Sequence, residues 1–473
     1  MWRNLAHVCR RWRHLLYDST SHLDMYLLLT NKSPSLSTLS HLPPLPLVID
    51  YSDRTDIVAR KHEGHDTIQL GLQQHDHVRR VFLQAPSSSL RMWLDSEPIN
   101  KPFPRLKDLS LLSTTVEETN LMLPETFQAP DLRRLTLHGI GLSTGLQWLS
   151  STIALSTLSL THIGASCYFP PRQLVTQLQG LPYLEELSIG FAIPIPLPSS
   201  EEELLPAPIL PVKLPALRRL TYRGMDVFID TLAALINTPH LEQLSLIFFL
   251  NLSFSLVNLT EFINRTEAFG CLVAQVIFNK DGASMYYEQQ SIGKLSFRVN
   301  CEPLDWKIDS AIQVCNALGN FLFAVEELTI DLNEDWMPSD WENTLDSTMW
   351  HELLLPFVGV KKLHIGFLLT FELSQAMDAA VGGLDLELLP ELQELEVRLE
   401  IDDAKKVFSA FIETRESEGR PVDLLALPIP HAELVVPPRS ADYRTQATSL
   451  VSIYRTFIQE GKQTFHPQNE LRM

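Results

Sequence analysis

Cysteine and basic residues are scarce in this sequence of 473 residues. The five cysteines are odd in number, are scattered along the chain and form no C-x-x-C pair, which is typical of a reducing compartment where thiols serve as small core residues. Lysine and arginine total 38 against 57 acidic residues, which gives a net charge of −19. This balance disfavours general binding to nucleic acids or anionic membranes, because either partner requires a basic face. We therefore expect no nucleic-acid or membrane partner.

Long apolar runs are also missing. The most apolar stretch, 244–259, is interrupted by Asn and Ser and is shorter than the roughly 20 residues that span a bilayer. No continuous apolar run follows the early arginines, whereas a signal peptide requires one. A hydrophobic content of 45% is nevertheless sufficient for a packed core. We expect an intracellular protein, located in the cytoplasm, the nucleus or both.

The motifs of common catalytic centres are absent as well. No P-loop, G-x-S-x-G or G-x-G-x-x-G occurs, and His351-Glu352 is not followed by the second His of H-E-x-x-H, because position 355 is Leu. Four histidines lie close together in the sequence: His62, His65, His75 and His77. A metal site is conceivable there, but without a consistent ligand framework solvated loop histidines are the favoured interpretation. The sequence predicts a protein that is not an enzyme and has no catalytic residue, cofactor or metal.

A repeated L-x-x-L-x-L pattern dominates the middle of the chain. Regular copies begin at Leu106, Leu132, Leu155, Leu184, Leu217 and Leu241, and looser copies begin at Val78, Ile292, Val325, Val360 and Leu392. Successive starts from Val78 to Leu241 are between 23 and 33 residues apart, and helix-like stretches separate them. One copy alone is weak evidence, but eleven copies are typical of leucine-rich repeats. An ordinary α/β domain would not keep this spacing.

The repeat predicts the fold class. In each copy the second and third apolar residues point into the core, and each unit buries its apolar face only against the next. We expect an α/β leucine-rich-repeat solenoid over residues 76–425, curved, with parallel strands on its concave face. Around 275–299 the residues Lys280-Asp281-Gly282 stand between two β-rich runs, which favours a hairpin.

The remaining segments are expected to connect or cap this array. Residues 34–75 form a linker and N-terminal cap, and residues 426–473 form a Pro-rich linker and a tail that is partly disordered. Two further stretches, 194–211 and 331–346, are expected to be exposed loops. The second contains Trp336 and Trp341 among acidic residues, which favours a basic peptide as a minor alternative to a solvated insertion.

The chain opens with a short basic segment, NLAHVCRRWRHLL, that has helical periodicity. Its apolar stripe consists of Leu5, Val8, Cys9, Trp12 and Leu16, which share one face of an α-helix. Helices under about 12–15 residues are marginal in water. The helix must therefore pack against another surface.

This segment closely resembles the second half of an F-box, whose helix carries L-x-x-V-C-[RK]-x-W-x-x-L. The matching residues are Leu5, Val8, Cys9, Arg10, Trp12 and Leu15. The continuation, including LPPLPLVIDY and WHELLLPFVGVKKLHI, is similar to a large family of fungal F-box proteins with leucine-rich repeats. The front half of the F-box, with its Leu-Pro pair, has no counterpart, so residues 1–33 are expected to be a partial, all-α F-box-like segment.

The resemblance implies a substrate-recognition subunit of an SCF-type ubiquitin ligase. A Skp-type adaptor would bind the F-box-like helix through Leu5, Val8, Cys9, Trp12, Leu15 and Leu16, and the repeats would bind an unknown target protein. With half of the F-box present, we expect weak adaptor binding from these residues alone. The alternative is a repeat scaffold that binds a protein without recruiting a ligase.

Two columns of residues are expected on the concave face. The first lies between the last two apolar positions of each strand and holds Ser110, Thr136, Ser159, Ser188, Thr221, Ser245, Ser296, Thr329, His364 and Glu396. The β-propensity of small hydroxyl residues accounts for most of this column. The adjacent column is charged and alternates in sign: Asp108, Arg134, Glu186, Arg219, Glu327, Lys362 and Glu394. We expect this mixed-charge stripe to bind the target. Reversing Arg134 and Arg219 to Glu should weaken target capture with little change in thermal stability.

Overall fold

The computed structural model describes Cys9, Arg11 and residues 26–30, 45–53, 65–115, 121–142, 149, 152–194, 210–249, 256–289, 293–301, 304–333, 347–381 and 388–427. The chain forms two compact units, the first comprising Met1–Phe269 with Ser291–Phe297 and the second Gly270–Gln290 with Arg298–Met473. Each unit combines helices with strands that pair mostly in parallel. The fold class is therefore mixed α/β.

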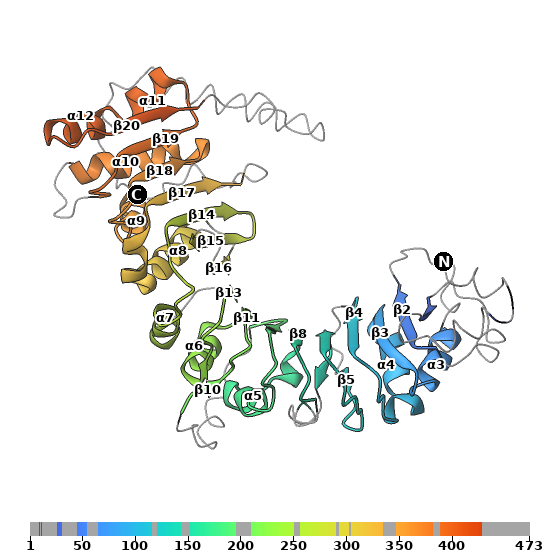
Figure 1. Cartoon of the computed structure of the whole chain (residues 1–473). Helices are drawn as coiled ribbons and strands as arrows, with labels where there is room; N and C mark the ends of the chain where they lie inside the picture. The colour runs from blue at the N-terminus through green and yellow to red at the C-terminus, as the bar shows by residue number, and fades with distance from the viewer. Residues whose placement is uncertain are drawn as a thin grey trace, which may run out of the picture. The chain divides into compact units, whose positions relative to one another are not determined.

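The sheet of the first unit consists of parallel strands that follow one another in chain order (Figure 1). Its strands are β1 (Leu27–Leu29), β2 (Leu47–Ser52), β3 (Val78–Ala85), β4 (Asp108–Ser113), β6 (Arg134–His138), β8 (Thr157–Ile163), β9 (Glu186–Phe191), β11 (Arg219–Gly224) and β13 (Gln243–Phe249). The beginning of β16 (Gly293–Asn300) lies beside β13, where the Lys294 N–H donates to the Glu242 carbonyl at 2.9 Å.

Helices of the first unit lie along one side of these strands (Figure 1). They are α3 (His65–Gln73), α4 (Ser87–Leu94), α5 (Pro171–Leu178), α6 (Asp226–Leu235) and α7 (Val257–Asn264), with the short 3-10 turns η2 (Glu97–Asn100) and η4 (Ala165–Cys167). Two small parallel pairs complete the unit. They join β5 (Met122–Leu123) to β7 (Gly141–Leu142) and β10 (Val212–Lys213) to β12 (Ile236–Asn237).

The L-x-x-L-x-L pattern gives each strand one buried face. In β4 the side chains of Leu109 and Leu111 are 3% and 2% exposed, whereas Ser110 between them is half-buried. The register aligns equivalent leucines across six strands: Leu109, Leu135, Leu158, Leu187, Leu220 and Leu244. Because burying each such side chain stabilises the fold by about 1.5–3 kcal/mol, the aligned leucines fix the register of the sheet.

The same pair of backbone hydrogen bonds recurs where many of the strands begin. Two consecutive N–H groups, those of Arg133 and Arg134, donate to the Lys107 carbonyl at 2.8 and 3.0 Å. Equivalent pairs of N–H groups donate to the carbonyls of Arg133, Ser156, Glu185 and Arg218 in the first unit, and to those of Leu272, Glu326 and Lys361 in the second. Both units are thus built from one repeated local geometry.

The second unit has a sheet in the order β15-β14-β17-β18-β19-β20. Its strands are β14 (Val273–Asn279), β15 (Gly282–Gln289), β17 (Glu327–Leu332), β18 (Lys362–Ile365), β19 (Glu394–Val397) and β20 (Asp423–Ala426). Its helices are α8 (Leu304–Leu318), α9 (Ser347–Leu354), α10 (Thr370–Val381), α11 (Ile401–Val407) and α12 (Ser409–Ser417), with 3-10 turns η6 (Gly319–Ala324) and η7 (Phe367–Leu369). All neighbouring strands from β14 to β20 along this order are parallel, but β14 and β15 are antiparallel.

The antiparallel pair occupies the stretch for which the sequence predicts a hairpin. Strands β14 and β15 are joined by Lys280 and Asp281, and the Asp281 N–H donates to the Asn279 side chain at 3.0 Å. Beneath the turn, the buried side chain of Lys307 in α8 donates to the Lys280 carbonyl at 3.1 Å. This bond anchors the turn to a helix.

The sheet extends further toward the N-terminus than the repeat predicts. Strand β1 lies within residues 1–33, which are expected to be all-α, and β2 and α3 lie within residues 34–75, expected to be a linker and cap. Both strands alternate between buried and exposed side chains, which suffices for pairing, but neither carries L-x-x-L-x-L. The division into two units falls near Phe269, within the stretch 76–425 over which the repeat array is predicted.

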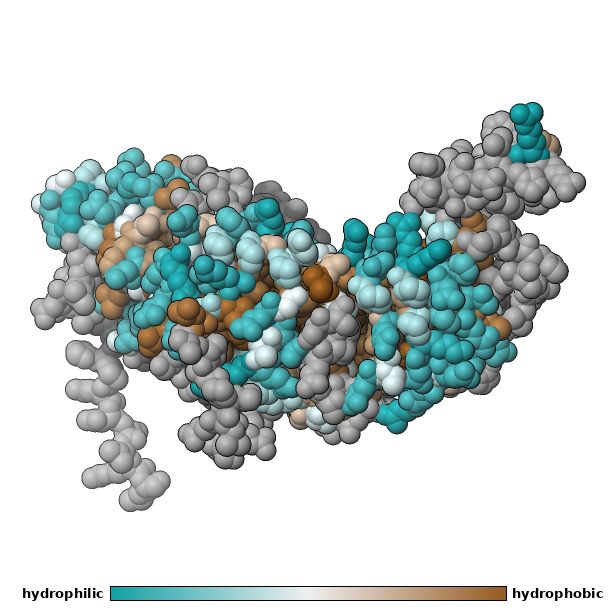
Figure 2. Space-filling model, turned by 60° about the horizontal axis from the view of Figure 1, so that its bottom comes forward, coloured by the Kyte–Doolittle hydropathy of each residue, from teal (hydrophilic) through white to brown (hydrophobic). Residues whose placement is uncertain are grey.

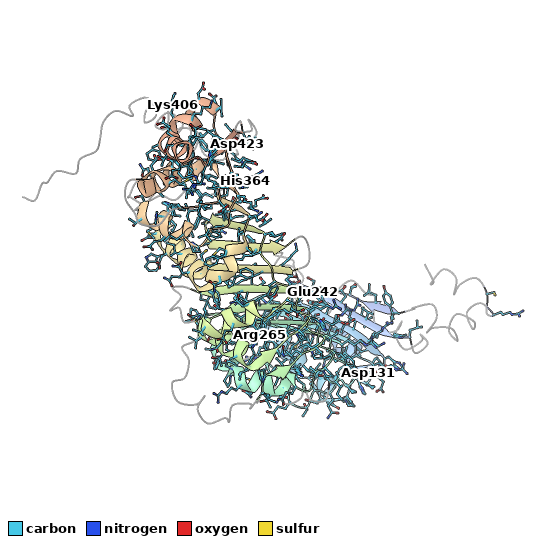
Figure 3. The ribbon with its side chains drawn as sticks, turned by 60° about the vertical axis from the view of Figure 1, so that its left-hand side comes forward. Asp131, Glu242, Arg265, His364, Lys406 and Asp423 are labelled. Atoms are coloured by element: carbon cyan, nitrogen blue, oxygen red, sulfur yellow. The ribbon has the colours of Figure 1, made fainter. Side chains whose placement is uncertain are left out.

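Two arginines donate to the carbonyl groups of neighbouring segments. Arg265, the residue that follows α7, is exposed and donates to the carbonyls of Ala233 and Ile236 at 2.8 and 2.7 Å, at the end of α6 (Figure 3). Arg415 of α12, which is 3% exposed, donates to the Pro390 and Leu392 carbonyls. These bonds occupy carbonyl groups that the ends of helices and loops leave unpaired.

The outer surface carries hydrophilic residues interspersed with hydrophobic ones (Figure 2). None of the helices in the described ranges is both long enough and apolar enough to cross a membrane.

Candidate functional site

The solvent-facing side chains of the first-unit sheet form three rows that run across the strands. The charged row contains Arg80, Asp108, Arg134, Thr157, Glu186, Arg219 and Gln243. The hydroxyl row contains Phe82, Ser110, Thr136, Ser159, Ser188, Thr221 and Ser245. The histidine row contains Gln84, Leu112, His138, Thr161, Gly190, Arg223 and Ile247. The face is open and polar.

Ion pairs join neighbours within the charged row. The carboxylate of Asp108 accepts hydrogen bonds from Arg80 Nε at 3.0 Å and from Arg134 Nε and Nη2 at 2.6 and 3.0 Å. Burial by itself raises the pKa of Asp108, but the hydrogen bonds and charges of the two arginines outweigh burial and hold the pKa below its ordinary value. Farther along the row, Arg219 pairs with Glu186. Four residues predicted to bind the target thus lie in one row.

The other three predicted residues lie together in the second unit. Glu327, Lys362 and Glu394 are in register on β17, β18 and β19. Lys362 Nζ lies 2.8 Å from Glu394 and 3.5 Å from Glu396. His364, which Figure 3 shows on the strands of this unit, lies between Glu396 at 3.1 Å and Glu327 at 3.3 Å. This face carries more carboxylates than basic groups.

Within each unit, then, the structure brings the predicted mixed-charge stripe together. Its charges are largely paired with each other across strands. The stripe therefore offers less unpaired charge to a partner than its composition indicates. Asp108, for example, is shared by two guanidinium groups, Arg80 and Arg134.

The hydroxyl row lies between the charged row and the histidine row. Its side chains are half-buried, and the Ser296 hydroxyl donates to Ser245 at 3.0 Å. Its members are short, and Phe82 is the one aromatic residue in it. The row therefore offers hydrogen-bonding groups rather than a stacking surface for bases.

Sequence reasoning missed a cluster of basic groups in the histidine row. The rings of His138 and His162 stack with their centroids 5.1 Å apart. His138 Nδ1 lies 3.0 Å from the Thr161 hydroxyl. Arg223 lies on β11, two strands beyond β8, and its guanidinium lies over the ring of Phe249 at 5.2 Å from the centroid.

Burial lowers the pKa of both imidazoles, and the positive charge of Arg223 lowers it further. His162 enters this face through a β-bulge, because β8 shifts register against β9 between Leu160 and Ile163. In the sequence, Gly190 of β9 is the residue that signals this bulge, since an isolated glycine within a strand often marks a bulge or a close approach of backbones.

The predicted adaptor-binding residues can be placed only at Cys9, which is exposed. Leu5, Val8, Trp12, Leu15 and Leu16 lie outside the described residues. So do His62, the loop residues Trp336 and Trp341, and the tail from 428 onward.

Of the four clustered histidines, His75 lies with its Nδ1 2.9 Å from the Pro102 carbonyl. Within the ranges that the structure covers, no group of three or more His, Cys, Asp or Glu residues is arranged to bind a metal.

Comparison with known proteins adds no relative. No protein-family model matches the chain, and no curated protein matches it significantly.

Proposed function

We propose that this protein is an F-box-like leucine-rich-repeat protein that recognises a target for an SCF-type ubiquitin ligase. The observation that carries the proposal is the recurrence of one backbone hydrogen-bond pattern at the start of β6, β8, β9, β11, β13, β17, β18 and β19, together with L-x-x-L-x-L burial. Both features are expected of a leucine-rich-repeat solenoid. The F-box-like helix supplies the link to a ligase, and the proposed location is the cytoplasm, the nucleus or both.

The polar faces of the strands support a protein target. They combine paired charges, small hydroxyls and partly exposed histidines over many strands, and repeat proteins typically use such extended surfaces to bind partners. Specificity on such a surface comes from charge complementarity more than from buried apolar area. We infer that each unit presents part of the target-binding surface.

The test of the ligase link is adaptor binding by Trp12→Ala. A Trp on the F-box-like stripe that contacts a Skp-type adaptor should act as a hot spot. We therefore expect the unmodified chain to retain purified adaptor weakly, and Trp12→Ala to abolish that weak retention while leaving the melting temperature nearly unchanged. The matched control is Trp306→Ala, because Trp306 of α8 is 45% exposed and its loss should leave adaptor retention intact.

Two results would redirect the proposal. A lower melting temperature of Trp12→Ala with no effect on the adaptor would make the opening helix a cap of the repeats. No retention of adaptor by the unmodified chain would favour the alternative, a scaffold that binds a protein without recruiting a ligase.

A further inference from the structure

Three basic side chains lie on neighbouring strands at the histidine row: His138, its stacked neighbour His162, and Arg223. His138 and His162 stack with their ring centroids 5.1 Å apart, and Arg223 of β11 is paired with Gly190 of β9, beside Thr161. None of the three forms an ion pair with an acidic residue in the described part of the chain. The net charge of the chain is −19, so a group of basic side chains that forms no ion pair among the described residues differs from the acidic character of the chain as a whole.

Arg223 differs from the other arginines that face solvent on this sheet. Arg80 and Arg134 share Asp108, and Arg219 pairs with Glu186. Arg223 instead lies over Phe249, 5.2 Å from the ring centroid. Stacking on an aromatic face fixes the guanidinium plane while its N–H edge remains able to donate to a planar anion.

His162 shows two signs of a binding residue. Its backbone has φ of 58°, a left-handed conformation that costs energy for a residue other than glycine and that clusters at functional sites. Its Nε2 is buried and has no hydrogen-bond partner among the described residues. Buried polar atoms are nearly always satisfied by the protein, water or a ligand, so this unpaired nitrogen marks His162 as a residue whose hydrogen-bond partner is not supplied by the described residues.

Gly190 brings the cluster together across β9. A Cβ at this position would lie 3.5 Å from Arg223 Cβ and 3.6 Å from Thr161 Cα. Because glycine places no side chain there, the histidines on one side and Arg223 on the other are not separated by a bulky group. The Thr161 hydroxyl, 3.0 Å from His138 Nδ1, holds the first ring in place.

We propose that His138, His162 and Arg223 bind a carboxylate group in an acidic segment of a partner protein. The assignment deepens the proposed function, since it rests on the sheet face being the target-binding surface. Arg223 supplies the fixed charge, and the imidazoles supply nitrogen groups for the remaining carboxylate oxygen. A planar carboxylate matches the fork of a guanidinium.

Charge matching favours a carboxylate over a phosphate. Burial and Arg223 keep the pKa of both imidazoles low, so near neutral pH the cluster carries the single charge of Arg223. One carboxylate balances that charge, whereas a doubly charged phosphate would require an imidazole to take up a proton. The adjacent hydroxyl row, with Ser159 and Ser188 on β8 and β9, offers groups to an extended peptide that a small free anion would not use.

The test is binding of a fluorescent peptide of consecutive glutamates to the whole chain, measured by anisotropy at neutral pH. We expect Arg223→Gln to weaken binding by about tenfold or more, since hydrogen bonds to charged groups are worth about 1.5–3 kcal/mol. His162→Gln should weaken binding as well. The matched control is Arg91→Gln, which removes the same charge from α4 on the helical side of the unit and should bind as the unmodified chain does.

Competition distinguishes the chemistry of the ligand. Acetate should displace the glutamate peptide more effectively than inorganic phosphate does, and a peptide of consecutive glutamines should not bind. The proposal is overturned if the unmodified chain does not bind the acidic peptide, if Arg223→Gln and Arg91→Gln bind alike, or if phosphate is the better competitor. Circular dichroism of each variant shows that it is folded. Because the assay needs no adaptor, its failure is distinct from failure of the ligase link.

Discussion

Substitution of Asp108 measures how much the ion pairs of the charged row contribute to the stability of the first unit. Its side chain is 15% exposed and joins β3, β4 and β6 through Arg80 and Arg134. Replacing Asp108 by Asn keeps the shape and removes the charge. Hydrogen bonds to charged groups are worth about 1.5–3 kcal/mol, whereas exposed ion pairs are worth about 0.2–1 kcal/mol. Since Arg80 and Arg134 are 52% and 57% exposed, we use the lower range.

Since Asp108 forms two such ion pairs, we expect Asp108→Asn to lower the free energy of unfolding of the first unit by about 0.4–2 kcal/mol. Because the chain has two units, global melting would mix two transitions. Hydrogen exchange in urea, read by mass spectrometry on peptides that cover β3, β4 and β6, reports the local effect. In a double-mutant cycle with Arg134→Gln, the two substitutions should be less than additive, with a coupling of about 0.5–1 kcal/mol.

The pH dependence of the same variant provides a second check. The pKa of Asp108 is below its ordinary value of 3.8, so the folded state binds fewer protons than the unfolded state in this range. Its stabilisation is fully present above pH 3.8 and is lost as the pH falls through the folded pKa. The control is Glu242→Gln, which removes one carboxylate whose partner is Arg218. Equal exchange in Asp108→Asn and the unmodified chain, or strict additivity with Arg134→Gln, would refute the reasoning.

Two further predictions concern buried groups. Lys307→Ala should destabilise the second unit by about 2–4 kcal/mol, because it leaves a cavity and removes the donor to the Lys280 carbonyl. Hydrogen exchange of β14 and β15 measures this loss, with Lys405→Ala on the exposed side of α11 as the control. Equal exchange in the two variants would contradict the role of Lys307. His138 and His162 have pKa values below their ordinary 6.5, so the unfolded state binds more protons and the stability of the first unit should fall as the pH drops below 6.5. Replacing both by Gln should flatten that dependence in urea unfolding, and an unchanged slope would contradict the assignment.

The sequence predicts the repeated strands well because their signal is strong and local. Apolar residues three and then two positions apart specify which side chains are buried, as Leu109 and Leu111 demonstrate. Strands β1 and β2 were not predicted, because Leu27–Leu29 and Leu47–Ser52 lack the motif and pair by alternation alone. The division near Phe269 could not be read from the pattern either, since looser copies continue on both sides of it.

The candidate sites were predictable to different degrees. The charged stripe follows from strand position, so its residues were found, but pairing depends on side-chain conformation and on the register between strands. Reversal of Arg134 to Glu would place two carboxylates together at Asp108, so it should cost some stability, contrary to the expectation from sequence. The histidine cluster depends on a bulge that sets Thr161 and His162 against Gly190, and strict alternation cannot anticipate a bulge.

The difference between the charged row and the histidine row bears on how a partner would be chosen. A carboxylate that binds Arg134 must displace Asp108, so one ion pair is exchanged for another and the net gain is small. A charged row of this kind lowers the affinity for a partner of unmatched charge more than it raises the affinity for a partner of matched charge. Arg223 has no carboxylate to displace among the described residues, so an incoming carboxylate gains an interaction outright. We therefore expect substitutions at Arg223 to change affinity, and substitutions in the charged row to change which partners are tolerated.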